Sequence, residues 1–318
     1  GFIGAGSFAQ GTLMPSMKGF CNFIGISTGS GNTAKYVGEK YGFNYLYSSS
    51  EEIFNEGKIN TVFITTRHNL HSENVLKSIK TNKNVFVEKP LAMNETELFE
   101  IKKAYENSIS KGDTKMLMVG FNRRFSPAIQ DLKKIFLAEQ IKSIVIRVNA
   151  GVMPIDHWVN DPEIGGGRII GEACHFIDLA MYIADSPIIS VSADSIDDSN
   201  HLNNTVVINL KMKNGSIASI NYFSNGNKLV SKEQIEVFCA GNIAHINDFK
   251  SLKIIGNTSK HYRYNTQDKG HAKCVQTFLK NINEGKDCPI PFSESYLSML
   301  ATFKVNQSLK ENRKILIS

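Results

Sequence analysis

A glycine-rich turn at the start of the chain constrains the fold most strongly. Gly4 and Gly6, with Ala9 three residues further on, form a G-x-G-x-x-A pattern between a short apolar run and a helix-compatible segment. The first glycine permits a tight turn, the second lets the backbone approach a pyrophosphate, and the small third residue allows close helix packing. N–H groups at the helix start, here Ser7 and Phe8, would bind the phosphates. The pattern predicts a dinucleotide site, with a purely structural turn as the alternative.

The first 120 residues alternate short β-rich runs with helical stretches, which is typical of βαβ units and a parallel sheet. Expected strands are 2–3, 23–26, 61–65, 85–87 and 116–119, and expected helices are 8–17, 33–41, 72–81 and 95–108. Alternating runs at 143–149, 206–212, 216–223 and 234–239 predict an antiparallel sheet, accompanied by helices at about 171–184, 272–284 and 293–312. Asn214-Gly215 between two of these runs predicts a type I′ hairpin.

These patterns predict an α/β fold with two domains. The length of 318 residues also favours two domains, because it exceeds the usual size of one hydrophobic core. The first, residues 1–121, is expected to be a dinucleotide-binding Rossmann domain with a parallel sheet. The second, residues 122–318, is expected to be an α+β domain with a mostly antiparallel open sheet that serves substrate binding and oligomerisation. Hydrophobic residues make up 42% of the chain and charged residues 21%, as in ordinary folded proteins.

Composition excludes several other classes of protein. The five cysteines form no C-x-x-C pair, which argues against a disulfide framework and a structural zinc site, so we expect a cytoplasmic protein without a metal. The net charge of +6 is spread thinly, so no nucleic-acid partner is expected. No long apolar run or signal peptide is present, which argues against a membrane partner. Because the chain opens without Met, we expect missing upstream residues or a fused upstream domain.

The segment after the second expected strand bears on which dinucleotide binds. An acidic residue there would hold the ribose hydroxyls of NAD, but residues 27–32 are small and polar and include Thr28 and Ser30. Their hydroxyls are available to a 2′-phosphate, and no carboxylate repels it. The segment therefore favours NADP slightly over NAD, while a plain loop that tolerates NAD stays open.

A lysine and a proline follow the strand at 85–87. The sequence Glu88-Lys89-Pro90 resembles the E-K-P motif of the Gfo/Idh/MocA family of oxidoreductases, whose lysine belongs to the active site and whose Lys-Pro peptide is typically cis. The resemblance implies that Lys89 faces the nicotinamide and the substrate, with Glu88 beside the cofactor. A surface ion pair next to a turn proline is the alternative.

Two further stretches resemble the same family. Residues 65–71 resemble its T-x-x-x-x-H region, which implies that Thr65, Thr66, His68 and His71 line the cofactor cleft, although a histidine beginning a helix is often a cap or packing residue. Residues 120–125 resemble G-[YF]-N-x-R-F. There the side chains of Asn122, Arg123 and Arg124 are expected to bind substrate oxygens or a cofactor phosphate, with interdomain salt bridging as the alternative for one arginine.

The segment 165–178 resembles the family's G-G-x(n)-D-x-G-x-H-x-x-D motif, in which a helix presents histidine to the substrate. His175 matches that histidine, but Gly171 stands where the family has aspartate, with Glu172 next to it. Glu172, His175 and Asp178 would follow one side of a helix, where neighbouring carboxylates favour imidazolium. We expect His175 and Glu172 to be catalytic and Arg168 to bind substrate, with a packing histidine as the alternative.

The stretch Asp156-His157-Trp158 holds the only tryptophan. Aromatic and polar groups together suit a sugar face and its hydroxyls, so all three residues are candidate substrate contacts. A buried tryptophan beside an exposed Asp-His pair is an equal alternative.

The resemblance spans nearly the whole chain and looks most like a branch found in polysaccharide-biosynthesis settings. It implies an NAD(P)-dependent dehydrogenase that transfers hydride between nicotinamide and a secondary carbon of a sugar, nucleotide sugar or polyol, with Lys89 assisting His175 in moving the hydroxyl proton. A homo-oligomer is also implied. Two alternatives remain: a non-catalytic module that senses a dinucleotide or sugar, and an NAD-assisted glycoside hydrolase.

Overall fold

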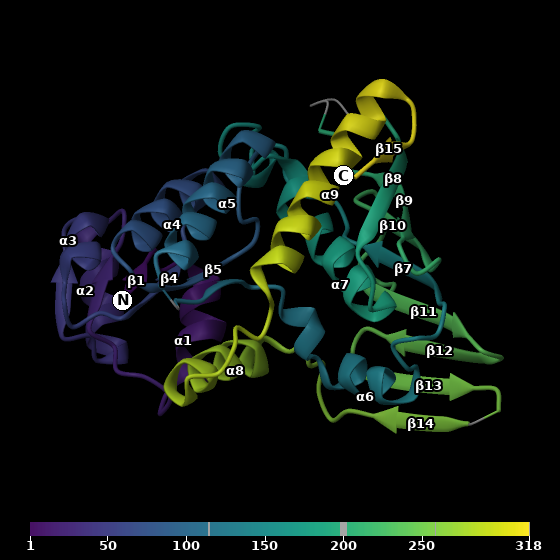
Figure 1. The fold of residues 1–318 in the computed structure, drawn as a ribbon, viewed down its shortest axis with the longest axis horizontal. Coiled ribbons are helices and arrows are strands. Elements are labelled where there is room, and N and C mark those ends of the chain that lie inside the picture. The colour runs from purple at the N-terminus through teal and green to yellow at the C-terminus, as the bar shows by residue number, and fades with distance from the viewer. Residues whose placement is uncertain (114, 198–201, 258, 318) are drawn as a thin grey trace. The chain divides into compact units, whose positions relative to one another are not determined.

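The computed structural model describes residues 1–113, 115–197, 202–257 and 259–317. They form two compact units, one of residues 1–120 and 271–296, the other of residues 121–270 and from 297 on (Figure 1). These units differ from the predicted ranges 1–121 and 122–318 by placing residues 271–296 with the first. Within the described ranges, no helix is long and apolar enough to cross a membrane.

The first unit contains the predicted parallel sheet. Its strand order is β3-β2-β1-β4-β5-β6 and all its neighbours pair in parallel, which confirms the Rossmann-like prediction. The strands are β1 (Phe2–Ile3), β2 (Gly25–Ser27), β3 (Tyr45–Tyr47), β4 (Thr61–Ile64), β5 (Asn84–Val87) and β6 (Leu117–Val119). Its helices include α1 (Met14–Met17), α2 (Gly31–Tyr41), α3 (Ser50–Asn55), α4 (His71–Lys80), α5 (Glu95–Ser110) and α8 (His271–Glu284). The strand β3 and the helix α3 were not predicted from the sequence.

Aromatic side chains on neighbouring strands explain why α8 belongs to this unit. The ring of Phe2 on β1 stacks on Phe63 of β4 at 4.9 Å between centroids, and Phe63 stacks on Phe86 of β5 at 5.2 Å. Phe278 of α8 contacts both Phe63 and Phe86 edgewise or tilted, at 6.0 and 5.6 Å. Burial of a phenylalanine contributes about 1.5–3 kcal/mol, so this contact is a substantial part of what holds α8 on the sheet.

The second unit is built on one large sheet of order β14-β13-β12-β11-β7-β10-β9-β8-β15. All its neighbours pair antiparallel except β7 and β10, so the predicted mostly antiparallel sheet is confirmed. Its strands are β7 (Ser143–Asn149), β8 (Ile188–Ser195), β9 (Val206–Met212), β10 (Ile217–Phe223), β11 (Glu233–Cys239), β12 (Asn242–Asn247), β13 (Ser251–Ile255), β14 (Lys260–Arg263) and β15 (Ile315–Leu316).

One face of this sheet carries the core. Inward residues alternate along the strands, as in the buried Ala218, Ile220 and Tyr222 of β10. Helix α7 (Cys174–Ala184) packs on β7 and β10, and Figure 1 shows it lying along the sheet. It directly continues a π-helical turn, η5 (Ile169–Ala173). The remaining helices include α6 (Pro127–Ile135) and α9 (Phe292–Glu311), whose residues from 297 on belong to this unit.

The hairpin between β9 and β10 forms as predicted, but the prediction of a type I′ turn is wrong. Gly215 N–H donates to Met212 O at 3.1 Å and Met212 N–H donates to Ser216 O at 2.9 Å, which closes a three-residue loop. Gly215 has a φ of +96°, whereas Asn214 lies outside the positive-φ region. This is the arrangement of a turn followed by one left-handed glycine, so only Gly215 needs the freedom of glycine.

Candidate functional site

Four neighbouring strands bring most predicted cofactor residues to one edge of the first unit's sheet. Because β2, β1, β4 and β5 are parallel and adjacent, the residues that follow them lie together at their carboxyl ends, where ligands of such sheets bind. The residues concerned follow β1 (Gly4, Gly6, Ser7, Phe8, Ala9), β2 (Thr28, Ser30), β4 (Thr65, Thr66, His68, His71) and β5 (Glu88, Lys89).

The glycine turn has the geometry that a pyrophosphate requires. Gly4 has a φ of +89°, and a Cβ there would lie 2.7 Å from Thr65 O, so the protein itself demands glycine. Thr65 Oγ1 donates to Gly4 O at 2.9 Å and joins the two loops. At Gly6 a Cβ would meet no protein atom within 4 Å, so packing does not explain that glycine. The helical residues 7–17 begin directly after it, so the turn fits a dinucleotide phosphate.

Predicted cofactor residues also lie next to the glycine turn and after β2. The side chain of Phe8 is 39% exposed and its ring meets His271 edgewise at 5.4 Å. After β2, Thr28 Oγ1 donates to Ser30 O at 2.6 Å, which folds this loop back before α2. The loop carries no carboxylate, as the sequence analysis noted.

His71 supports the loop that carries Lys89. Its ring is fully buried; Nδ1 donates to Pro90 O at 2.6 Å, and Nε2 lies 3.3 Å from Thr66 O. Burial lowers the pKa of His71 to about 4, although both carbonyls favour the protonated ring, so the neutral form dominates near neutral pH. A direct contact of His71 with a cofactor stays a prediction, because the ring is enclosed by protein.

The Lys89–Pro90 peptide is cis, as the resemblance predicts. The side chain of Lys89 is half-buried. The backbone N–H of the preceding residue, Glu88, donates to Ile64 O at 2.9 Å. A Cβ on Gly120 would lie 2.9 Å from Glu88 Oε1, so glycine makes room for this carboxyl. Burial raises the pKa of Glu88 to about 7, against the opposing attraction of Lys89. A carboxyl with a raised pKa beside a lysine is an arrangement that recurs at functional sites.

In the second unit, the two predicted substrate arginines form buried ion pairs. Arg123 Nε and Nη2 donate to the two carboxylate oxygens of Glu233 at 2.8 and 2.9 Å. Arg124 Nε and Nη2 donate in the same way to Asp178, at 2.8 and 2.6 Å. Both guanidinium forks are therefore engaged by carboxylates of their own unit, so neither of these ion pairs is the interdomain salt bridge that was the alternative for one arginine. A contact of either arginine with substrate stays a prediction.

Glu172 lies in the π-helical turn before α7, where its carboxylate collects several partners. Tyr222 Oη donates to Glu172 Oε2 at 2.6 Å, Arg168 Nη2 donates to Oε1 at 3.3 Å, and Lys232 Nζ lies 3.7 Å from Oε2. Arg168 is buried and also donates to Gly151 O at 2.7 Å. π-Helical turns recur at functional sites, and this one is stabilised by charge.

His175 is the second residue of α7 and is 8% exposed, with the ring of Phe121 edgewise at 6.0 Å. The sequence analysis expected Glu172, His175 and Asp178 along one side of a regular helix. Instead Glu172 precedes α7 in the π-helical turn, and Asp178 is turned to Arg124 and to Ser298, whose Oγ donates at 3.0 Å. A π-helical turn holds an extra residue, so the helix at Glu172 is not the regular one that was predicted, and the common side of the three residues stays a prediction.

The remaining predicted substrate residues are spread over loops. Asn122 Nδ2 donates to Lys269 O at 2.7 Å. Asp156 is exposed, and the rings of His157 and Trp158 stack at 5.9 Å while both side chains are half-exposed. The alternative of a buried tryptophan is therefore wrong, and these rings stay candidates for a sugar face.

Four polar or charged partners in this region were not predicted from the sequence. They are Tyr222, Lys232, Glu233 and Lys269, of which Lys269 Nζ donates to Glu233 Oε1 at 2.6 Å. Tyr222 occupies an inward position of an alternating strand, so its burial was predictable, but the partner of its hydroxyl was not. No sequence signal connects Glu233 with Arg123, which are 110 residues apart.

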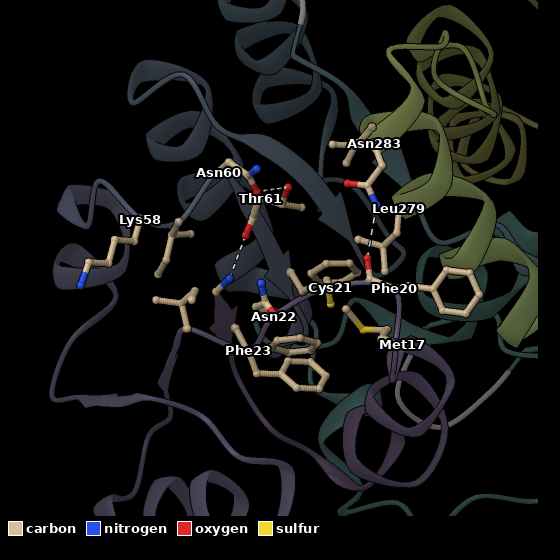
Figure 2. A pocket seen from close by; sticks show the side chains of 17 residues that line it. Met17, Phe20, Cys21, Asn22, Phe23, Lys58, Asn60, Thr61, Leu279 and Asn283 are labelled. Atoms are coloured by element: carbon tan, nitrogen blue, oxygen red, sulfur yellow. Dashed lines mark hydrogen bonds between the residues drawn. The ribbon is translucent and has the colours of Figure 1, made fainter.

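A pocket of about 460 Å³ lies elsewhere in the first unit (Figure 2). It is lined by residues at the amino ends of the strands, among them Phe2, Phe23, Asn60 and Thr61. Figure 2 shows Asn283 at its rim, where Nδ2 donates to Phe20 O at 3.3 Å. Gly4 lies at the opposite, carboxyl end of β1. The pocket is thus remote from the glycine turn, and the carboxyl edge is the better candidate site.

Comparisons with protein families match parts of both units. A model described as "Oxidoreductase family, NAD-binding Rossmann fold" matches residues 1–121, and the GFO/IDH/MocA C-terminal domain matches residues 140–241.

Individual relatives cover most or part of the chain. A myo-inositol 2-dehydrogenase of Thermotoga maritima is 25% identical over 298 residues, 87% of this chain and 85% of the relative. A scyllo-inositol 2-dehydrogenase (NAD(+)) of Bacillus subtilis is 31% identical over 163 residues, which are 50% of this chain and 45% of the relative. A solved levoglucosan dehydrogenase in complex with NADH and levoglucosan has the same fold, with a TM-score of 0.85, 18% identity and coverage of 99% of this chain and 98% of that one.

Proposed function

Because the chain belongs to the Gfo/Idh/MocA family of NAD-binding oxidoreductases, we propose that it oxidises or reduces a secondary carbon of a sugar, nucleotide sugar or polyol. The observation that carries this proposal is the glycine turn of Gly4 and Gly6 on the same sheet edge as Lys89. Relatives named as inositol dehydrogenases support the alcohol chemistry and the polyol class.

The proposal assigns each unit a part of the chemistry. When bound, the nicotinamide accepts or returns the hydride of a secondary C–H bond. His175, assisted by Lys89, takes or returns the proton of the hydroxyl on the same carbon. Glu172 assists by its charge next to α7. The candidate substrate contacts remain Asn122, Arg123, Arg124, Asp156, His157, Trp158 and Arg168.

A substrate screen tests this function. The purified chain is mixed with NAD(+) or NADP(+) and myo-inositol, scyllo-inositol and a panel of hexoses, and formation of the reduced cofactor is followed by absorbance. We expect turnover with at least one polyol or sugar. Cofactor binding without any turnover would favour the sensing module instead, and cleavage of a glycoside without net reduction would favour the hydrolase.

We further propose that NADP is accepted as well as NAD. The support is the absence of a carboxylate in residues 27–32, together with hydroxyls at Thr28 and Ser30. Thr28 Oγ1 already donates to Ser30 O, so the side chain of Ser30 is the better candidate to bond a 2′-phosphate. Calorimetric titrations with NADH and NADPH decide this, and failure of NADPH to bind would reject it.

Gly6 offers a sharp test of the cofactor site. We expect Gly6→Val to fold with nearly unchanged stability, because a Cβ there meets no protein atom within 4 Å. The same substitution should weaken NADH binding by about tenfold or more, because the side chain occupies the approach of the pyrophosphate. Calorimetry and thermal unfolding measure the two effects.

The matched control is Gly11→Ala in the same helical stretch, where a Cβ also meets no protein atom. It should stabilise the protein by about 0.5–1 kcal/mol and leave binding intact. Equal NADH affinity in Gly6→Val and the parent chain would contradict the assignment.

The same proposal includes a cytoplasmic homo-oligomer. The outer face of the second unit's sheet supports association, because it carries partly exposed apolar residues such as Ile217 and Phe238. Sedimentation velocity measures the mass directly, and a value equal to one 35.4-kDa chain would reject the oligomer.

A further inference from the structure

Four cationic side chains of the second unit share two carboxylates. We call Arg123, Arg168, Lys232 and Lys269, together with Glu172 and Glu233, the cationic cluster. Glu233 accepts from Arg123 at 2.8 Å and from Lys269 at 2.6 Å. Glu172 accepts from Arg168 at 3.3 Å and lies 3.7 Å from Lys232. Four positive and two negative charges leave an excess of two positive charges.

Most of the cluster is buried, and its most exposed member is a lysine. The side chains of Arg123, Arg168 and Glu233 are 9%, 4% and 0% exposed, whereas Lys232 is 41%, Glu172 22% and Lys269 16% exposed. Removing charges from water without equal counter-charge is costly, so such clusters are normally balanced. An anion that approaches from the Lys232 side would supply the missing charge.

Lys232 is the member best placed to receive a ligand. Lys232 Nζ lies 3.7 Å from Glu172 Oε2, which is longer than a hydrogen bond, whereas Tyr222 Oη donates to the same oxygen at 2.6 Å. Burial lowers the pKa of Lys232 most strongly, and the charges of Lys269 and Arg123 lower it further, while Glu172 and Glu233 oppose this. Lys142, whose side chain is fully buried, contrasts with it: its Nζ donates to backbone carbonyls at 2.7 and 3.2 Å.

The cluster adjoins the helix that carries His175. Glu172 lies in η5, which continues without a break into α7, and His175 is the second residue of α7. A group bound by Lys232 would therefore lie near the start of the helix that presents the proposed proton carrier.

We propose that the cationic cluster binds an anionic group of the substrate, a carboxylate or a phosphate carried by the sugar, through Lys232 and Lys269. This inference rests on the proposed function and narrows its substrate class to acidic sugars, such as uronates, or to sugar phosphates. The net charge selects the class, because a neutral polyol leaves the excess of two positive charges uncompensated.

The test measures binding, so that it does not depend on turnover. D-glucose, D-glucuronate and D-glucose 6-phosphate are titrated calorimetrically into the chain saturated with NADH. We expect at least one of the two anions to bind at least tenfold more tightly than glucose, with an affinity that falls as salt is raised. A preference for glucuronate identifies a carboxylate, and one for the phosphate ester identifies a phosphate.

Two variants tie the preference to the cluster. Lys232→Met should reduce the ratio of the affinity for the anion to the affinity for glucose about tenfold, while NADH affinity and thermal stability stay unchanged. Lys253→Met, at an exposed position on β13, should leave this ratio intact. Equal affinities for glucose and both anions, no anion binding, or equal effects of the two variants would overturn the inference.

The outcomes separate this inference from the proposed function. Turnover of neutral polyols without any preference for anions rejects the anion site and keeps the dehydrogenase. Preferential anion binding through Lys232 without reduction of the cofactor by any substrate keeps the anion site and rejects the dehydrogenase.

Discussion

His175→Ala should lower kcat by about 100-fold to 10,000-fold, the usual contribution of a positioned general acid or base. The reason is that the hydroxyl proton would have no imidazole to move to when hydride leaves the same carbon. Steady-state kinetics with the best substrate from the screen measure this loss. NADH affinity should not change, because the glycine turn belongs to the first unit. Turnover at the parent rate would reject His175 as the proton carrier.

Two comparisons keep this result specific. His261→Ala, at an exposed position on β14, should leave kcat unchanged. The double variant Lys89→Met/His175→Ala should lose less activity than the product of the single losses, because both side chains are proposed to act on one proton transfer. Fully multiplicative losses would assign Lys89 to a separate step.

Glu233→Gln should destabilise the protein by about 3–5 kcal/mol, the usual cost of breaking a buried ion pair from one side. The substitution keeps the shape of the side chain but leaves Arg123 and Lys269 without their carboxylate, and Glu233 is fully buried. Urea unfolding measures the loss. Glu236→Gln, a half-exposed position on the same strand, should change stability by no more than about 0.5 kcal/mol. A loss below about 1 kcal/mol for Glu233→Gln would contradict the ion-pair argument.

The same carboxylate makes stability depend on pH. Burial alone would raise the pKa of Glu233, but the charges and hydrogen bonds of Arg123 and Lys269 outweigh it and lower the pKa to about 2, from 4.5. Between these values the unfolded chain binds more protons, so the stabilisation is complete above pH 4.5 and is lost as pH falls toward 2. The free energy of unfolding should differ less between pH 3 and pH 6 for Glu233→Gln than for the parent chain.

Local patterns in the sequence determined the architecture of both units. The strands at 143–149 and 206–212 have the predicted bounds, because alternation of apolar residues depends only on neighbours along the chain. The glycine turn was likewise predictable, since a φ of +89° at Gly4 is a property that glycine alone supplies readily. The short edge strand β3 was missed because its exposed Tyr45 and Leu46 show no alternation. Helix α3 has a capping box of Ser49 and Glu52 that could have revealed it.

Tertiary structure alone decided the partners of the charged side chains. Arg124 and Asp178 are 54 residues apart and Arg123 and Glu233 are 110 apart, so their pairing depends on the tertiary fold. The sequence by itself determined which side chains are candidates for the chemistry and which strands the cofactor candidates follow. Whether an arginine binds a carboxylate of its own unit or is open to a ligand depends on long-range packing, because distances between such groups are not encoded in their spacing along the chain.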